Sequence, residues 1–384
     1  MEPKPRIAIF SPWIKSRGGA ERVILEILKR SRCDIDLYTF LYDKDRTFLE
    51  FKDFDVHVIP SHLPRKSFFL KGLVLGARLL LSKIPGIGDY DVLIISSGGV
   101  AELASLRNRA KKTVVLSHTP LRAAHSMYEY YKKSRLANRI LVPLAVEVYK
   151  SLEKMAWKRL DYAMVLSKEV EQRLVSYGLI KQENILRLGP VVEKPNVKTY
   201  KKREKIIFYP SRFATYKRQE LAIISFKRAG LARKGFRLVL AGFVEDLSYL
   251  QELQDLSEGD KSIVIKTNVS EHELWDLYAR SYVTLFLPVN EDTGLVPLES
   301  LSCGTPVIAA DEGGPREFIR SGVNGLLVKA DPVDVASALI KVTKGDVYTR
   351  LRKGAARSKR YDEKRFIKKF DSSIKKIVSA PLKA

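Results

Sequence analysis

Cysteine is nearly absent from this sequence: its 384 residues include only Cys33 and Cys303, which lie 270 positions apart. This spacing matches no metal or redox motif, and one distant pair cannot form the disulfide framework of a small secreted protein. We therefore expect both cysteines to be small buried apolar side chains. No cluster of His, Cys and carboxylates has metal-ligand spacing, so the sequence predicts neither a bound metal nor another cofactor.

Long hydrophobic runs are also missing. The first six residues are charged, Pro or Met and lead directly into the apolar run 7–10, without the apolar core of a secretory signal. The best candidate for a membrane span, residues 68–81, is interrupted by Lys71 and Arg78 and is too short to cross a bilayer. The sequence thus predicts a cytoplasmic protein that does not span a membrane.

Acidic residues are scarce relative to basic ones, with 44 Asp and Glu against 68 Lys and Arg and a net charge of +24. The excess is concentrated in residues 61–160, with 18 basic and 6 acidic residues, and in residues 351–384, with 12 and 3. Residues 251–300 have the opposite balance, with 3 and 10. Such a division indicates a surface that meets an anionic partner, either a membrane or a nucleic acid.

What the sequence does contain is an alternation of short apolar runs with helical patterns, which predicts an α/β fold with parallel sheets. The length favours two domains of roughly 150–200 residues. We expect domains at 1–190 and 205–360, an aperiodic linker at 191–204 and an amphipathic C-terminal helix within 361–384. The predicted strands are 7–10, 35–40, 56–59, 92–96, 113–117, 163–166, 206–209, 237–241, 263–266, 283–287 and 307–309.

The segment 290–319 carries the clearest chemical signal. Glu291 follows a predicted strand, Gly294 precedes a predicted helix, and Glu299 lies near the middle of that helix. Exposed amides at a helix start, together with the helix dipole, favour a diphosphate. Carboxylates accept paired hydrogen bonds from the vicinal hydroxyls of ribose or a hexose. The pattern therefore predicts a nucleotide-sugar site.

This E-x7-E segment resembles that of the family 4 retaining glycosyltransferases, and other motifs follow in the expected order along essentially the whole chain. The resemblance implies a GT-B fold, in which two Rossmann-like domains with parallel sheets face each other across a cleft. In the segment 209–223, it implies that Arg212 and Lys217 bind the donor diphosphate and that Ser211 and Arg218 are further donor-binding residues. It also implies donor contacts from Val269, Gly294, Leu295 and Val296.

Two motifs of the first domain extend the resemblance. Gly18 and Gly19, at the start of a predicted helix, match a glycine-rich loop that approaches the donor phosphates or the acceptor. The segment 117–131 resembles that of bacterial mannosyltransferases of surface-polysaccharide assembly. There His118 is expected to contact the donor sugar as a catalytic residue, with Arg212, Lys217 and Glu291, while Arg122 is expected to contact the acceptor or a phosphate.

The resemblance implies metal-independent transfer of a hexose with retention of configuration. GDP-mannose is the expected donor, and a lipid-linked or polysaccharide-precursor saccharide is the expected acceptor. The cations among leucines between Pro64 and Pro85 predict peripheral attachment to an anionic membrane on its cytoplasmic face. Three alternatives stay open: a UDP-sugar transferase, a sugar-nucleotide epimerase on the same fold, and a basic nucleic-acid-binding protein. We expect no nucleic-acid partner, because the sequence shows no motif for one.

Overall fold

The eleven apolar runs predicted as strands all form strands in the computed structural model of the protein. The structure describes residues 4–60, 68–133, 138–192, 197, 200–358 and 361–381, with the backbone alone for 68–74, 133 and 138–142. Two further strands, β7 (Ile185–Arg187) and β13 (Gly325–Val328), were not predicted. Each is only three or four residues long and lies at the edge of its sheet, and a run this short does not distinguish a strand from other structure even where most of its residues are apolar.

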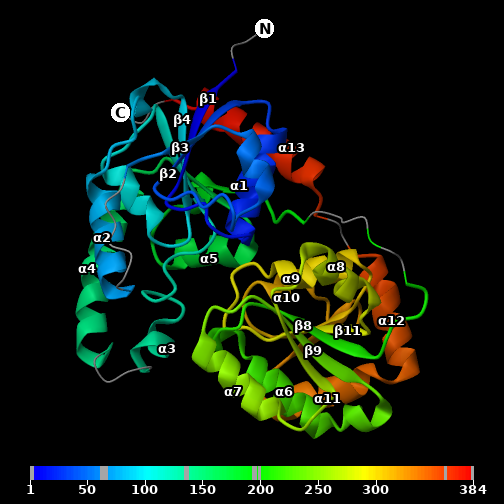
Figure 1. The fold of residues 1–384 in the computed structure, drawn as a ribbon. Coiled ribbons are helices and arrows are strands. Elements are labelled where there is room, and N and C mark those ends of the chain that lie inside the picture. The colour runs from blue at the N-terminus through cyan, green and yellow to red at the C-terminus, as the bar shows by residue number, and fades with distance from the viewer. Residues whose placement is uncertain are drawn as a thin grey trace. The chain divides into compact units, whose positions relative to one another are not determined.

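The chain divides into two compact units, which we call unit 1 (Met1–Val191 with Glu363–Ala384) and unit 2 (Val192–Asp362). Each unit contains one sheet whose paired strands are all parallel (Figure 1). Two Rossmann-like units of this kind make the GT-B fold that the sequence predicts.

Unit 1 contains a sheet of order β3-β2-β1-β4-β5-β6-β7. Alternate residues of β1 face two separate cores: Ile7 and Ile9 pack with α1 and α13, whereas Ala8 and Phe10 pack with α2, α4 and α5. Helices therefore cover both faces of the sheet, as its near-continuous apolar strands require. The strands are β1 (Arg6–Ser11), β2 (Asp34–Thr39), β3 (Val56–Val58), β4 (Val92–Ser97), β5 (Lys112–Ser117), β6 (Tyr162–Val165) and β7; the helices are α1 (Gly19–Arg30), α2 (Phe68–Leu81), α3 (Tyr128–Lys133), α4 (Asn138–Lys158), α5 (Lys168–Ser176) and α13 (Glu363–Ser379).

Unit 2 contains a sheet of order β10-β9-β8-β11-β12-β13. Ile207 and Tyr209 of β8 pack on one face with α6, α7, α11 and α12, and Ile206 and Phe208 pack on the other with α8, α9 and α10. The strands are β8 (Ile206–Pro210), β9 (Arg237–Gly242), β10 (Ile263–Thr267), β11 (Val283–Phe286), β12 (Val307–Ala310) and β13; the helices are α6 (Gln219–Ala229), α7 (Leu247–Ser257), α8 (Glu271–Arg280), α9 (Leu295–Ser302), α10 (Pro315–Phe318), α11 (Pro332–Val342) and α12 (Gly345–Ala356). Short 3-10 helices are η1 (Leu49–Asp53), η2 (Ile87–Asp89), η3 (Ala101–Leu106), η4 (Gln182–Asn184), η5 (Thr215–Lys217) and η6 (Leu231–Lys234).

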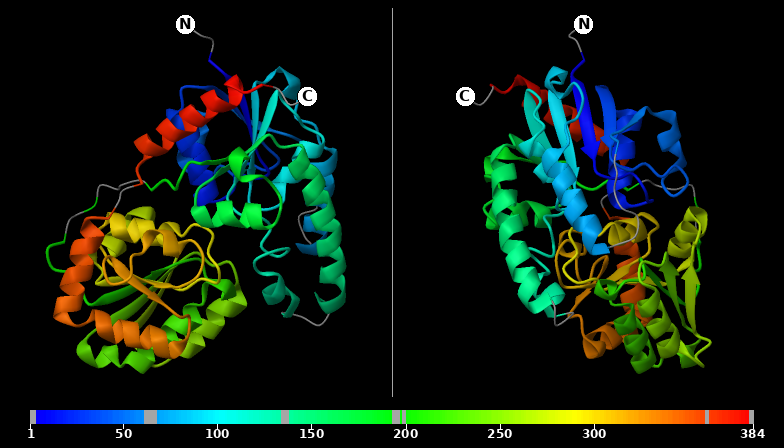
Figure 2. Two further views of the ribbon diagram at one scale, coloured as in Figure 1. Left: turned by 180° about the vertical axis from the view of Figure 1, so that it is seen from behind. Right: turned by 60° about the vertical axis from the view of Figure 1, so that its left-hand side comes forward.

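The C-terminal helix α13 belongs to the core of unit 1, although unit 2 separates it from the rest of that unit in sequence. Its apolar stripe, Phe366, Phe370, Ile374 and Ile377, is buried together with side chains of α1. Both views of Figure 2 show α13 (red) beside α1 (blue). Four lysines of the helix, Lys364, Lys368, Lys375 and Lys376, are exposed, whereas Lys369 is partly buried.

The predicted membrane-binding segment between Pro64 and Pro85 lies partly outside the described residues. In its described part, Leu79 is buried, and Leu75 and Leu80 pack against the same core. The Arg78 guanidinium lies over the Phe40 ring, and its Nη2 donates to the Pro60 carbonyl at 2.6 Å. Leu75, Leu79 and Leu80 thus pack on the core of unit 1, whereas Leu81, at the end of the same helix, is 66% exposed.

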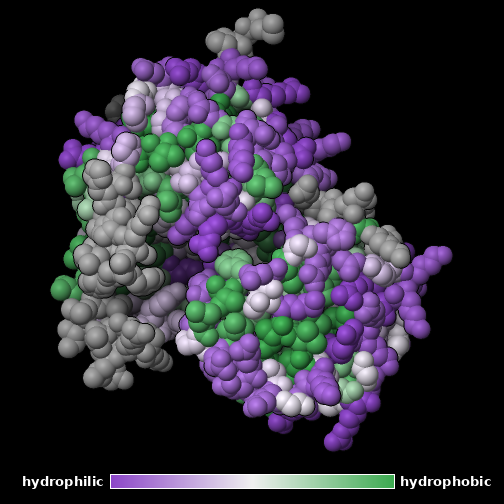
Figure 3. Space-filling view, viewed as in Figure 1, coloured by the Kyte–Doolittle hydropathy of each residue, from purple (hydrophilic) through white to green (hydrophobic). Residues whose placement is uncertain are grey.

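Within the described part of the chain, no helix combines the length and the apolar character needed to cross a bilayer. In the view of Figure 3, hydrophilic side chains cover most of the visible face of each unit, with smaller hydrophobic patches between them.

Cys33 and Cys303 are free thiols and are only partly buried, so our expectation that both are buried is wrong.

Candidate active site

The candidate site of unit 2 begins at the carboxyl ends of β8 and β11, which are neighbours in the sheet. Lys217 ends η5, shortly after β8, and Glu291 lies in the loop after β11. Lys217 Nζ lies 2.8 Å from Glu291 Oε2, and only 9% of the lysine side chain is exposed. The structure therefore joins two predicted site residues in one ion pair at the sheet edge where α/β folds bind ligands.

A buried hydroxyl ties these two loops together. The Tyr209 hydroxyl donates to the carbonyl of Lys217 and accepts from the amide of Leu287 at 3.0 Å. Burial raises the pKa of Tyr209, so the hydroxyl keeps its proton. Tyr209 lies in an apolar strand, where nothing in the sequence distinguished it from a core residue.

Arg218 braces the Glu291 loop from the other side. Its backbone is left-handed, with φ 54°, and its Nη1 lies 3.0 Å from Glu312 Oε1. The other oxygen of Glu312 accepts from the amide of Asn290 at 3.0 Å. Arg218, a predicted donor-binding residue, and Glu312, which we did not predict, thus fix the loop that carries Glu291.

Gly313 makes the close packing of this loop possible. Its φ is +59°, and a Cβ atom at this position would lie 2.2 Å from the carbonyl oxygen of Glu291. The next amide, that of Gly314, donates to the same oxygen at 2.8 Å. Both glycines belong to the segment 290–319, and the structure assigns to them the support of Glu291.

Arg212 is also paired with a carboxylate. Its Nη1 lies 2.9 Å from Glu245 Oε2, and the Tyr216 hydroxyl donates to the same carboxylate at 3.2 Å. Ser211, the residue before it, is fixed through its amide, which donates to the Ala241 carbonyl at 2.9 Å. Each of the two predicted diphosphate-binding cations, Arg212 and Lys217, thus faces an anion that a diphosphate would have to replace.

Helix α9 follows the Glu291 loop and begins after Gly294, whose φ is 80°. Glu299 Oε2 accepts from the Tyr278 hydroxyl at 2.6 Å, and burial raises the pKa of this tyrosine well above its usual value. The hydroxyl therefore remains a donor that holds the Glu299 carboxylate in place.

Three of the predicted donor contacts have core side chains. Val269, in the loop after β10, and Leu295 and Val296, at the start of α9, pack against the apolar cluster beneath α8 and α9. Any contact that these residues make with a polar ligand must therefore come from their backbone groups.

The predicted site residues of unit 1 lie in two loops. His118 follows β5, and its Nε2 lies 2.9 Å from the Ser96 hydroxyl. Burial lowers its pKa to about 4, so the imidazole is neutral at physiological pH. Arg122 lies in the same loop, where its carbonyl accepts from the Met127 amide at 2.8 Å and closes a turn.

A buried polar network supports this loop. His125 stacks on Tyr177 with ring centroids 4.2 Å apart, and its Nε2 lies 2.8 Å from Glu153 Oε2. Tyr149 joins Glu153 to a second buried carboxylate, Glu102, at 3.1 and 2.7 Å. Burial raises the pKa of Glu102. The sequence analysis assigned no role to His125, which the structure places in this support.

Gly18 and Gly19 lie at the start of α1, beside the Glu21 carboxylate. Glu21 is 5% exposed and accepts from the Ser16 hydroxyl at 2.6 Å. A Cβ atom at Gly18 would lie 2.6 Å from Glu21 Oε2. An acidic side chain thus occupies the positive end of the helix, where a phosphate would meet a like charge.

Among the residues that the structure describes, no group of three or more His, Cys, Asp or Glu side chains is placed to hold a metal ion. Asp43, in the D-x-D sequence 43–45, accepts from the amides of Asp45 and Arg46 at 3.3 and 3.2 Å. Its carboxylate therefore caps a turn.

Residues 192–360, almost the whole of unit 2, match the model of the family described as Glycosyl transferases group 1. Unit 2 is therefore similar to the members of this family of enzymes. The glycosyltransferase activity and the family resemblance predicted from the E-x7-E segment are thereby confirmed.

Two relatives that match most of this chain share the same name. The chain is 25% identical to the alpha-1,3/1,6-mannosyltransferase ALG2 of Dictyostelium discoideum, with 98% of each sequence covered. It is 24% identical to the human protein of the same name, covering 88% of this chain and 87% of the relative.

A solved structure confirms the GT-B fold of this glycosyltransferase. The Anabaena protein Alr3699/HepE, crystallised with UDP and glucose, superposes with a TM-score of 0.70 at 17% identity. The match covers 97% of this chain and all of that chain.

Proposed function

We propose that this glycosyltransferase moves a mannosyl group from GDP-mannose to a lipid-linked saccharide, with retention of the anomeric configuration. The observation that carries the proposal is the Lys217–Glu291 pair, 2.8 Å apart, at the ligand-binding edge of the unit 2 sheet. The relatives named alpha-1,3/1,6-mannosyltransferases support the choice of sugar. The sequence motifs of the first domain support it independently.

The proposed reaction breaks the bond between the anomeric carbon and the diphosphate oxygen and forms a bond from that carbon to an acceptor oxygen on the same face. Arg212 and Lys217 neutralise the charge that develops on the departing diphosphate. The proton of the acceptor hydroxyl passes to a phosphate oxygen of the leaving nucleotide. Because two fixed cations face the diphosphate, the reaction needs no metal ion or other cofactor.

The remaining site residues position the substrates. Glu291 holds sugar hydroxyls, and Glu299, oriented by Tyr278, holds the ribose. His118 is neutral and contacts the sugar through a hydrogen bond, while Arg122 contacts the acceptor or its phosphate. The donor also receives hydrogen bonds from backbone groups of five residues: Ser211, Val269, Gly294, Leu295 and Val296. The backbone of Gly18 and Gly19 binds uncharged hydroxyl groups, because the Glu21 carboxylate disfavours a phosphate there.

Donor choice and reaction are tested together by nucleotide release. Incubation with GDP-mannose and a mannosylated prenyl-diphosphate acceptor should yield GDP and an α-linked product, with no loss of rate in a metal chelator. UDP-glucose with the same acceptor is the control. The proposal is contradicted if nucleotide is released without an acceptor, as an epimerase would release it. It is also contradicted if the enzyme uses UDP-sugars but not GDP-mannose.

We also propose that the enzyme acts at the cytoplasmic face of a membrane, to which it attaches peripherally. The exposed lysines of α13 support this placement, because each cation near an anionic leaflet contributes about 1 kcal/mol. Lys368→Glu, Lys375→Glu and Lys376→Glu together should reduce co-sedimentation with anionic vesicles. The same change at three exposed lysines of unit 2, Lys234, Lys261 and Lys341, is the control, and equal losses would exclude α13 as the contact.

A further inference from the structure

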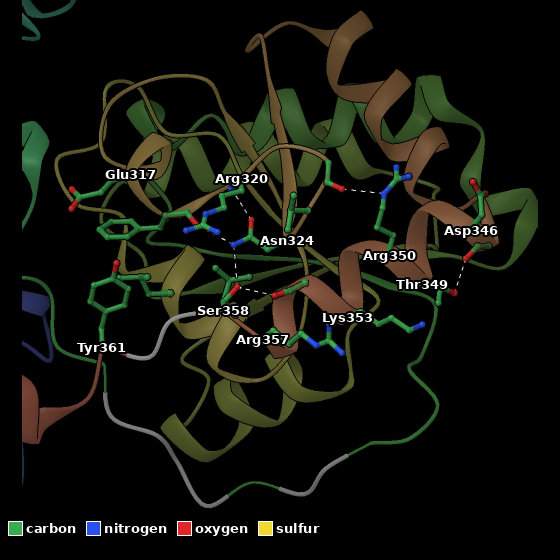
Figure 4. Close-up of a pocket in the computed structure, with 17 residues that line it drawn as sticks. Glu317, Arg320, Asn324, Asp346, Thr349, Arg350, Lys353, Arg357, Ser358 and Tyr361 are labelled. Carbon is green, nitrogen blue, oxygen red and sulfur yellow. Dashed lines mark hydrogen bonds between the residues drawn. The ribbon is translucent and has the colours of Figure 1, made fainter.

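Unit 2 has a second concave region, apart from the Lys217–Glu291 pair. This groove has a volume of about 1120 Å³ and is bounded by α9, α10, residues 319–324 and α12 (Figure 4). Leu298, Leu301 and Phe318 line it from the α9 and α10 side and are 4%, 6% and 6% exposed. A groove of this volume can admit a small organic ligand.

The walls of the groove are fixed by buried contacts. The Asn324 side chain donates to the Phe318 carbonyl at 3.1 Å and to the Ser358 hydroxyl at 3.0 Å, and it accepts from the Arg320 amide at 2.7 Å. At Gly354, α12 lies so close to the loop 319–324 that a Cβ atom added to this glycine would lie 2.0 Å from the Val323 carbonyl oxygen. The groove is therefore a built feature of unit 2.

Four cations line this groove: Arg320, Arg350, Lys353 and Arg357. In Figure 4 the two acidic residues of the lining, Glu317 and Asp346, lie at opposite ends of the view, with the labelled cations between them. Within the described parts of the chain, Arg320, Lys353 and Arg357 have no carboxylate within 4.0 Å of their charged groups, and Arg350 Nε donates only to the Gly322 carbonyl, at 3.1 Å. Among the described residues, these four cations outnumber the two carboxylates that line the groove, so its lining carries a net positive charge.

We infer that this groove binds the phosphate or diphosphate group of an organic ligand. Arginines pair with phosphate oxygens in bidentate geometry, whereas Leu298, Leu301 and Phe318 are almost fully buried, so the phosphate contacts would carry the binding. Leu298 and Leu301 lie on α9 on either side of Glu299, so the bound ligand would lie against the helix that carries a proposed donor contact. The inference goes beyond the proposed function and does not depend on it.

Calorimetric titration with pyrophosphate tests this site in the full chain. The double variant Arg320→Gln/Arg357→Gln should weaken binding about tenfold or more, because two charge-assisted contacts are lost. The control Arg228→Gln/Arg233→Gln removes the same charge from exposed positions of unit 2 and should leave that affinity unchanged. Lys217→Ala should leave the groove site intact.

The inference is overturned if the wild type binds no pyrophosphate or if both double variants lose pyrophosphate binding equally. It is also overturned if Lys217→Ala is the only variant that loses pyrophosphate binding. Two sources of the phosphate group are distinguished by vesicles containing phosphatidic acid. A selective loss of vesicle binding in Arg320→Gln/Arg357→Gln, relative to its control, identifies a lipid headgroup. A loss confined to pyrophosphate identifies a soluble phosphate ester.

Discussion

At the residue scale, the proposed site consists of charges that the protein itself already pairs. Lys217→Ala removes a cation from the proposed diphosphate contact and abolishes the ion pair with Glu291, which is 19% exposed. We expect a loss of about 2–4 kcal/mol of transition-state stabilisation from this change, and a similar loss from Arg212→Ala. The ratio kcat/KM measures it, with Lys234→Ala as an exposed control; full activity of both site variants would refute the assigned roles.

His118 gives a second prediction at this scale, on pH dependence. Burial lowers its folded pKa to about 4, below the unfolded value of about 6.5. Between these values the unfolded chain binds a proton that the folded chain does not, so the free energy of unfolding should fall as the pH drops from about 6.5 to about 4. His118→Gln should flatten this decline in urea titrations, whereas a decline identical to that of the wild type would show that His118 contributes nothing to it.

At the scale of elements, the loop that carries Glu291 depends on backbone fit. A Cβ atom at Gly313 would lie 2.2 Å from the Glu291 carbonyl oxygen, whereas at Gly259, with φ +74°, it would meet nothing within 4 Å. Both Ala substitutions strain a left-handed backbone, but only Gly313→Ala should also displace Glu291. We expect Gly313→Ala to lower kcat/KM at least about tenfold relative to Gly259→Ala. Comparable activities would mean that the close approach has no part in catalysis.

At the scale of the whole molecule, α13 makes the two ends of the chain one folding unit. Phe370 is fully buried against α1, whereas Val378 on the same helix is 42% exposed. Phe370→Ala should cost unit 1 about 3–5 kcal/mol, and Val378→Ala much less. Hydrogen exchange should show lost protection in α1 and β1 but unchanged protection in β8 and β9. If β8 and β9 lose protection as well, the two units do not unfold separately.

The sequence by itself determined the α/β class, eleven of the strands and the apolar stripe of α13, and its E-x7-E segment carried the resemblance to the family 4 glycosyltransferases. The strands and the stripe follow from local signals, because parallel strands covered on both faces are apolar throughout and a helix packed on a core is apolar along one face. The edge strands β7 and β13 were not predicted because runs of three or four residues, although mostly apolar, are too short to show the periodicity of a strand.

Only the tertiary structure decided which carboxylate each cation meets and which side chains support the site. Glu245, Glu312, Tyr209 and Tyr278 are far in sequence from the residues they contact, and no local pattern distinguishes them from surface acids or core tyrosines. It also decided that Leu79 and Leu80, next to Arg78, pack on the core of unit 1, whereas Leu81 is exposed. These pairings form because the parallel sheet places the carboxyl ends of strands that are distant in sequence next to each other. A pattern of neighbouring residues in the sequence therefore cannot predict them.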